Sequence, residues 1–571
     1  MYYDFKIEIP DVKGKIFERT IKGVTYINYE YDRIYKADKK YNIPKRTTIG
    51  KKCDDDPTMM YPNPNFLTYF PDVKLPKDDG RTERSSCLRI GTFIVLQKLM
   101  TESLLNKIIL ELYNNDDRGY GLFRDLAAYY LTTENNVGQY YPDYAYNHPL
   151  FTPGYKIYSD STVSEFTGQI SIEDSVHFQN EWNAIKKNKE KIYISYDSTN
   201  KNCQAGDIEL VEFGHAKEEK GLPIFNYSVA YDCNNREPLF YEDYPGSIVD
   251  VSQLQCMLDK AKAYGYKNAG FILDRGYFSR ENIRYMDKCG YDFVIMVKGM
   301  KALVNEAIKE VKGTFEEKRQ YTIKRYDVNG TTVKRFVFPS DEKIRYLHIY
   351  YSYHKAAAEK ELLEEKIEKI AAFLKKMEGQ AVTVDKSYEK YFSLEYYHEG
   401  KEDQCFLCAM EKSSVIEEEL SMCGYFCIIT SAEMTAQEAI ELYKSRDASE
   451  KLFRADKSFL GNKSMRIYSG NALEGKMLIA FVALILRNRM YTKLKDEEEN
   501  LNNRTNFMNV PAAIRELEKI EMIRQADGVY RLDHALTANQ KTILKAFDID
   551  ANEVKKKTQE ISNALNPRVK K

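Results

Sequence analysis

Two aspartates of this 571-residue chain follow apolar runs that are typical of β-strands. Asp197 lies near the end of the run KIYISYDS, and Asp274 ends the run AGFILD. Side chains at strand ends project beyond the hydrogen-bonded ladder, which is where ligand groups collect in such sheets. A half-desolvated carboxylate there favours a cation partner. Two of them on neighbouring strands could hold hard divalent ions such as Mg²⁺, although the simpler interpretation of each aspartate alone is a turn or helix cap.

A third acid lies in the stretch ELYKSRDASEKLFRADK, which predicts a helix. This stretch contains Tyr443, Arg446, Glu450 and Lys457, at offsets of 3, 7 and 14 from the tyrosine. With about 100° of rotation per residue, these offsets place all four side chains within a stripe of roughly 60° on one helix face. Such a stripe alone is typical of a solvated surface. Together with the two strand-end acids, it predicts a third carboxylate at the same site.

The spacing Tyr443-x2-Arg446-x3-Glu450-x6-Lys457 matches, without a gap, the YREK signature of a large class of insertion-sequence DDE transposases. The segments YISYDST and FILDRGYFS resemble the segments that carry the first and second catalytic aspartates of that class. The intervening text, FGHAKEEKGLPIFNYSVAYDCNNREPLFYEDYPGSIVD, resembles the second and third strands of the family. The chain is therefore similar to this family over about Ile192–Lys298 and Gly424–Asn488.

The resemblance implies metal-dependent phosphoryl transfer on DNA. The catalytic residues would be Asp197, Asp274 and Glu450, which would also hold two Mg²⁺ ions, with Mn²⁺ as a possible substitute. No other cofactor is implied. His215 could act as a general base, but a polar histidine in a loop is the preferred interpretation.

The resemblance also implies contacts to DNA backbone phosphates near the cut bond. We assign these contacts to Arg446, Lys457, Tyr443 and Arg275. The formal net charge is −1, so DNA binding must depend on where the charges lie. Asp11–Lys52 is locally basic, with twelve Lys/Arg against five Asp/Glu. Further candidates for DNA recognition are the helices before Lys191 and the basic tail (Lys555–Lys557 and Arg568–Lys571).

The predicted function is that of a transposase which cuts and joins DNA at the ends of an insertion sequence. Its partners would be double-stranded DNA, both element ends and target, and a second copy of the chain in a homodimer on paired ends. One alternative is a ribonuclease H-like nuclease that only hydrolyses DNA. Another is a transposase-derived DNA-binding protein without catalysis, which the presence of all three acids argues against.

The predicted fold class is α/β, with a ribonuclease H-like mixed sheet flanked by helices. An α+β insertion subdomain interrupts it, and the N- and C-terminal regions are mainly helical. Between Lys191 and Lys298 the predicted element order is β-β-β-α-β-α-β. The predicted domains are a mixed, locally basic region (1–95), a helical DNA-binding region (96–190), the first part of the catalytic domain (191–298), the insertion (299–421), the second part of the catalytic domain (422–500) and a helical C-terminal region (501–571).

Several further elements can be predicted. Thr322–Phe338 is predicted to be a hairpin with its turn at Asn329-Gly330, and a single helix is expected from Thr435 towards Phe459. Asn471–Asn488 is expected to be a buried helix. The pairs Cys405/Cys408 and Cys423/Cys427 have a spacing tolerable for zinc. The strand-like text GYFCIIT instead favours Cys427 as a small buried hydrophobe.

The location of the protein is predicted from what the chain lacks. The longest apolar run, Met477–Leu486, has ten residues, about half the length that spans a bilayer. The start MYYDFKIEIP has no apolar signal region, and ten cysteines are too few for a disulfide scaffold. We therefore expect a soluble protein of the bacterial cytoplasm, associated with the nucleoid through DNA.

Overall fold

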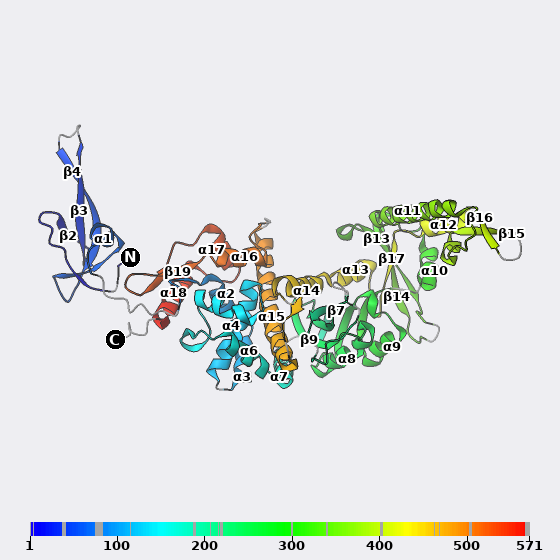
Figure 1. Ribbon diagram of the computed structural model, residues 1–571, viewed down its shortest axis with the longest axis horizontal. Helices are drawn as coiled ribbons and strands as arrows, with labels where there is room; N and C mark the ends of the chain where they lie inside the picture. The colour runs from blue at the N-terminus through cyan, green and yellow to red at the C-terminus, as the bar shows by residue number, and fades with distance from the viewer. Residues whose placement is uncertain are drawn as a thin grey trace. The chain divides into compact units, whose positions relative to one another are not determined.

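A computed structural model gives the structure of the chain (Figure 1). It describes residues 2–3, 5–36, 41–74, 84–114, 116–186, 190–205, 207–214, 216, 221–297, 301–338, 341–399, 403–461, 463–467, 469–501 and 505–565. The chain forms two compact units. The first unit contains Met1–Phe178, Ala455–Asn462 and Arg466–Lys571, and the second contains Gln179–Arg454 and Lys463–Met465. His215 and Arg568–Lys571 lie outside the described residues.

The second unit is built on a large mixed sheet, and its first seven elements occur in the predicted order. They are β7 (Glu190–Cys203), β8 (Ile224–Asp232), β9 (Glu237–Pro245), α8 (Asp250–Ala263), β10 (Asn268–Leu273), α9 (Arg280–Cys289) and β11 (Asp292–Met296). The strands lie in the spatial order β9-β8-β7-β10-β11. The first three are antiparallel to one another, whereas β10 is parallel to both β7 and β11. The prediction of a mixed α/β sheet with flanking helices is confirmed.

The two faces of this sheet have separate cores, because successive strand residues point to opposite faces. Phe271 and Leu273 of β10 pack on one face with residues of α8 and α9. Ile272, between them, packs on the other face with Ile440 and Tyr443 of α13 (Ala436–Lys444). Even-numbered residues at the end of β10 therefore face α13.

The predicted insertion contributes both to the main sheet and to a core of its own. The strands β13 (Val328–Arg335) and β14 (Arg345–Tyr351) continue the main sheet beyond β17 (Tyr425–Thr430). The separate core is formed by α11 (Tyr353–Met377), β15 (Phe392–Glu399), β16 (Asp403–Glu411) and α12 (Ser413–Ser421). The segment is thus only partly a separate subdomain.

The predicted turn at Asn329-Gly330 is wrong, because both residues lie inside β13. The chain reverses earlier, at the 3₁₀ turn Lys324–Tyr326, where Asp327 has a left-handed φ of 52°. Gly330 is required for packing instead, since a Cβ there would lie 2.8 Å from the ring of Tyr350. The Asn329 amide donates to the Phe315 carbonyl at 3.1 Å. Tertiary packing at this pair overrides its turn preference.

The first unit contains an antiparallel sheet. It lies in the region 1–95, for which the sequence predicted mixed secondary structure. Its strand order is β1 (Ile7–Glu8), β5 (Met59–Pro62), β4 (Tyr41–Lys52), β3 (Val24–Lys36) and β2 (Ile16–Ile21). Its small core includes Ile27, Ile49 and Met60.

The remainder of the first unit is mainly helical. Its helices include α2 (Gly91–Glu102), α3 (Leu105–Tyr113), α4 (Asp117–Thr133), α5 (Tyr141–Asn147), α6 (Asp160–Gln169), α15 (Gly470–Asn500), α16 (Val510–Leu517), α17 (Ala538–Lys545) and α18 (Ala551–Leu565). Every residue of Met477–Leu486 in α15 is buried, as predicted. In the described part of the chain, no helix has the length and apolar character needed to cross a membrane.

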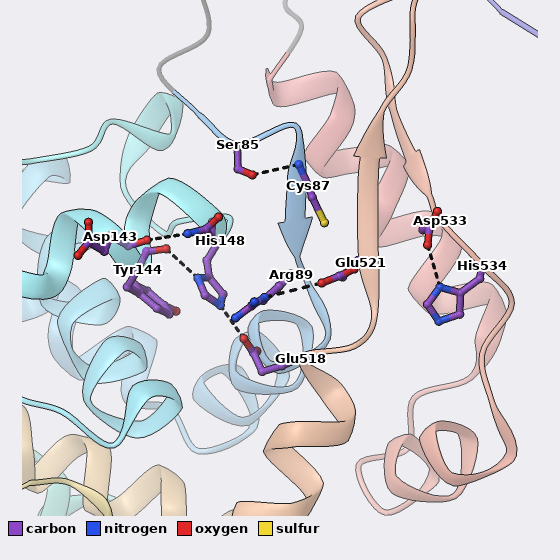
Figure 2. Close-up of polar contacts among 11 residues, drawn as sticks. Ser85, Cys87, Arg89, Asp143, Tyr144, His148, Glu518, Glu521, Asp533 and His534 are labelled. Atoms are coloured by element: carbon purple, nitrogen blue, oxygen red, sulfur yellow. Dashed lines mark hydrogen bonds and ion pairs between the residues drawn. The ribbon is translucent and has the colours of Figure 1, made fainter.

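A buried polar contact ties distant segments of this helical part together (Figure 2). The Nε2 atom of His148, after α5, lies 2.7 Å from Oε2 of Glu518, at the end of α16. The other ring nitrogen lies 2.7 Å from the Tyr144 carbonyl oxygen. Nearby, Arg89 of β6 (Cys87–Arg89) pairs with Glu521 of β19 (Glu521–Arg524) at 3.7 Å. The C-terminal segment is thereby bonded to residues more than 350 positions earlier in the chain.

Candidate active site

Asp197 and Asp274 lie side by side on neighbouring parallel strands. The last paired residues are Leu273 of β10 and Tyr196 of β7, so each aspartate is the next residue in register. Asp274 keeps an extended backbone, with φ −71° and ψ 160°. Parallel neighbours in a sheet are about 4.8 Å apart, and both aspartates are half-buried. The prediction that β7 ends close to Asp197 is wrong, because the strand continues to Cys203 through its pairing with β8.

Both aspartates face the helices that follow β17. Asp274 lies two residues after Ile272, which packs against α13. Asp197 lies two residues after Ser195, whose hydroxyl oxygen is 2.8 Å from that of Ser449. Because residues two apart share a face of a strand, the two carboxylates lie on the same side of the sheet as Ser449.

The helix that carries the third acid is not continuous, contrary to the prediction. It is divided into α13 and α14 (Asp447–Phe459), with Ser445 and Arg446 between them. The Ser445 hydroxyl donates to the Leu442 carbonyl at 2.6 Å, a local bond that competes with helix continuation. Asp447 and Glu450 both lie in the first turn of α14, where the helix dipole favours negative charge. The single-stripe geometry therefore does not hold, although Glu450 still reaches the acidic site.

The guanidinium of Arg446 connects the acids. Its Nη1 atom lies 3.1 Å from Oδ1 of Asp274, and its Nη2 atom forms a close ion pair with Oε1 of Glu450. The Arg446 side chain is only 13% exposed. Burial alone would lower its pKa, but Tyr443 and the three acids, Asp197 included, raise the pKa above its ordinary value. Three carboxylates from distant parts of the chain thus stabilise the positive charge of the Arg446 guanidinium.

The other predicted phosphate-binding residues occupy different environments. Tyr443 is buried in the core between α13 and the sheet, and burial raises its pKa to about 12. The Arg446 guanidinium carbon lies 5.5 Å from the centroid of the Tyr443 ring. Arg275 is exposed directly after Asp274. Lys457 is partly buried in the portion of α14 that belongs to the first unit.

A serine pair that the sequence reasoning missed fixes the start of α14 on β7. Ser195 and Ser449 are both fully buried. The Ser449 hydroxyl also donates to the Arg446 carbonyl at 2.8 Å. Ser449 lies between Arg446 and Glu450, so this contact sets the position of both neighbours. The sequence signal was a small polar residue, Ser195, inside an apolar run, whereas Ser449 lies in a charged stretch that gave no such signal.

We expect Ser449→Ala to lower the free energy of unfolding by about 1–2 kcal/mol, because it removes a buried hydrogen bond. If the site cuts DNA, as the resemblance in the sequence implies, cleavage should slow about tenfold, or ~1.4 kcal/mol, because Glu450 loses its support. Thermal unfolding and single-turnover cleavage measure the two effects. Thr435→Ala is the matched control, since it removes the N-cap bond at the far end of α13 and costs about 1 kcal/mol. Equal cleavage rates for the two variants would contradict a positioning role for Ser449.

The donor chemistry of the acidic site fits a divalent cation. Asp197, Asp274 and Glu450 offer carboxylate oxygens, which Mg²⁺ prefers, and Asp274 and Glu450 share a cationic partner in Arg446. Across the described residues, no three His, Cys, Asp or Glu side chains converge as a ready-made metal group.

The four cysteines spaced like zinc ligands belong to different parts of the second unit. Cys427 is buried in the core of the main sheet, whereas Cys405 lies in β16. Burial raises the pKa of the Cys427 thiol, which disfavours the thiolate that zinc binds. The structure supports the interpretation of Cys427 as a small buried hydrophobe.

Comparisons with known proteins identify a family for part of the chain. The family model described as the transposase DDE domain matches residues 193–486, just over half of the chain. Among solved structures, the chain is similar to a cryo-EM structure of the piggyBac transposase synaptic complex with hairpin DNA. The sequence identity is 8% and the TM-score is 0.31, and the match covers 72% of this chain and 65% of that chain. The comparison with curated proteins gave no match.

Proposed function

Since the chain belongs to the transposase DDE domain family, we propose that it is an insertion-sequence transposase in which Asp197, Asp274 and Glu450 hold the catalytic metal ions. The observation that supports this proposal is the position of the acids around Arg446. Asp274 and Glu450 pair with its guanidinium, and Asp197 contributes to its electrostatic environment. These residues are up to 253 positions apart along the chain, so local folding alone does not bring them near Arg446.

We assign the sheet β9-β8-β7-β10-β11 and its helices to a ribonuclease H-like core. The support is the strand order, the antiparallel first three strands and the two helical crossovers α8 and α9. The residues after β11 would then be the insertion, and α14 would return the third acid to the site. The region 96–190 remains a proposed DNA-binding region.

Two divalent ions at the three acids would supply an activated oxygen nucleophile and stabilise the leaving oxygen in an in-line displacement at phosphorus. The carboxylates of Asp197, Asp274 and Glu450 would position the ions and partly offset their charge. The sheet and the Ser195–Ser449 contact hold these side chains in place. Catalysis is then largely a matter of positioning and charge stabilisation.

Arg446 would have two successive partners. Its guanidinium pairs with Asp274 and Glu450. A divalent cation held by the same carboxylate oxygens would compete with Arg446 for them and would free its guanidinium. A released guanidinium suits a bidentate contact to a DNA phosphate. Tyr443 would support Arg446 from the core, and Arg275 and Lys457 would contact further phosphates.

The proposed partners are duplex DNA at the element ends and the target, with two copies of the chain on paired ends. The proposed ions are Mg²⁺, with Mn²⁺ as a substitute, and the proposed location is the bacterial nucleoid. The experiment first identifies inverted repeats in the DNA that flanks the gene, and then uses them as labelled duplexes with a target plasmid. With Mg²⁺ we expect cleavage at the repeat ends and joined products, and EDTA should abolish both. Cleavage without joining would favour a hydrolytic nuclease, and binding without cleavage would favour a DNA-binding protein.

A further inference from the structure

The strands β3 and β4 extend well beyond the rest of the N-terminal sheet (Figure 1). The strand β2 pairs with β3 only over residues 24–29, and β5 pairs with β4 only over residues 50–52. Residues 31–36 and 41–46, here called the ribbon, pair with each other. Within the described parts of the chain, no other strand pairs with them. The ribbon is therefore a two-stranded extension with two open edges.

The ribbon is exposed on both faces, although it carries large apolar side chains. All residues from 31 to 36 are exposed, and the exposed fractions are 61% for Tyr35, 53% for Tyr41 and 44% for Ile34. An isolated two-stranded hairpin is marginally stable in water. Clustered exposed apolar side chains mark interaction sites, so these features indicate a surface that is completed by a partner.

The base of the ribbon is anchored, so it can present these side chains in a defined direction. Glu30 is only 2% exposed and accepts hydrogen bonds from Nε of Arg33 at 2.5 Å and Nε of Arg46 at 3.1 Å. The Arg46 guanidinium carbon lies 3.9 Å from the centroid of the Phe17 ring. Both strands are thus fixed where they leave the sheet.

The charge of this region is opposite to that of the chain as a whole. The strands β3 and β4 contain six Lys/Arg and two Asp/Glu, in a chain with a net charge of −1. Cross-strand pairing places Lys36 opposite Tyr41 and Ile34 opposite Ile43, so lysine, tyrosine and isoleucine share one face. A positive, partly aromatic surface is complementary to nucleic acid.

From this geometry we propose that the ribbon binds duplex DNA by entering the major groove, an inference that rests on the proposed function. The major groove is about 12 Å wide and admits a two-stranded β-ribbon. Six residues at about 3.3 Å each give a ribbon of roughly 20 Å. Tyr41 lies on the same face as Lys36 and contacts base edges. Lys36 contacts backbone phosphates, and Lys45 exchanges its ion pair with Asp32, at 3.4 Å, for a phosphate. The ribbon thereby adds a DNA-binding element outside the helical region 96–190.

The phosphate contacts are tested with the full chain and a labelled duplex of the inverted repeat. Fluorescence anisotropy with Ca²⁺ in place of Mg²⁺ gives Kd over a range of salt concentrations. The double variant Lys36→Gln/Lys45→Gln should bind about tenfold or more weakly and reduce the salt slope by about 2. The control Lys22→Gln/Lys74→Gln removes two exposed lysines outside the ribbon and should stay within about twofold of wild type. Equal Kd and slope for both double variants would overturn the proposal.

The base contact is tested by Tyr41→Ser with two duplexes, the repeat and a scrambled sequence of equal length. We expect this variant to lose about tenfold affinity for the repeat and little for the scrambled duplex. If it instead loses self-association in sedimentation velocity while its Kd for DNA is unchanged, the ribbon binds a second copy and the proposal fails. A wild-type chain that neither binds nor cuts the repeat would refute the proposed function itself. Normal cleavage and unaltered DNA binding by the ribbon variants would refute only the proposed DNA-binding role of the ribbon.

Discussion

DNA cleavage by Asp197→Ala, Asp274→Ala and Glu450→Ala is expected to fall at least about a thousandfold, which corresponds to ~4 kcal/mol of transition-state stabilisation. Each acid would supply ligands that the other two cannot replace, because the acids lie on separate elements: β7, the end of β10 and the first turn of α14. DNA affinity should stay within a few-fold of wild type, since phosphate contacts elsewhere dominate binding. Single-turnover cleavage and anisotropy on the same repeat duplex measure the two quantities.

The matched control for these variants is Glu281→Ala. Glu281 is an exposed acid of α9 in the same unit, so its removal changes the net charge equally without touching the site. We expect its cleavage rate to equal that of wild type. Retention of cleavage within about tenfold of wild type by any of the three site variants would remove that residue from the metal site.

Arg446→Gln is expected to raise the affinity for metal and to lower the rate of cleavage. The guanidinium pairs with Asp274 and Glu450 in a site where it is 13% exposed. A unit charge about 4 Å away contributes ~1 kcal/mol in water and ~4 kcal/mol near a protein surface. Its loss should therefore tighten Mn²⁺ binding about tenfold, or ~1.4 kcal/mol. Cleavage at saturating metal should nevertheless slow about a hundredfold, because a charged phosphate contact is lost.

Isothermal titration with Mn²⁺, supported by electron paramagnetic resonance of the free ion, measures the affinity without any reaction. Arg275→Gln is the control, since it removes the same charge from the residue next to Asp274. Arg275 is exposed, so its loss should change Mn²⁺ affinity by less than about twofold, in keeping with solvent screening. Unchanged or weaker Mn²⁺ binding by Arg446→Gln would show that the guanidinium does not compete with the metal.

Much of the sheet could be predicted from the sequence, because its strands are apolar and bounded by polar turns. The runs around Ile194 and Phe271 predicted two strands that prove to be neighbours in parallel register. The ion pair of Arg446 with Glu450 could be expected from their four-residue spacing. These predictions depend on short-range sequence patterns, whose local structure does not depend on distant parts of the chain.

The failures arise from contacts that the sequence pattern does not show. Ser445 lies in a stretch with helical spacing, yet its local bond to Leu442 and the long-range contact of Ser449 with β7 accompany a break in the helix. Asn329-Gly330 has the composition of a turn, but Gly330 is needed under the Tyr350 ring. In the sequence, the ribbon appeared only as part of a stretch with an excess of Lys and Arg. Its exposure could not be predicted, because exposure depends on where the neighbouring strands end.

The most direct test of the metal site is a crystal structure grown with Mn²⁺ and read by anomalous diffraction. We predict anomalous peaks within about 2.2 Å of carboxylate oxygens from Asp197, Asp274 and Glu450, with the Arg446 guanidinium displaced from Asp274 and Glu450. Manganese bound elsewhere, with Arg446 still paired to both acids at saturating metal, would contradict the account.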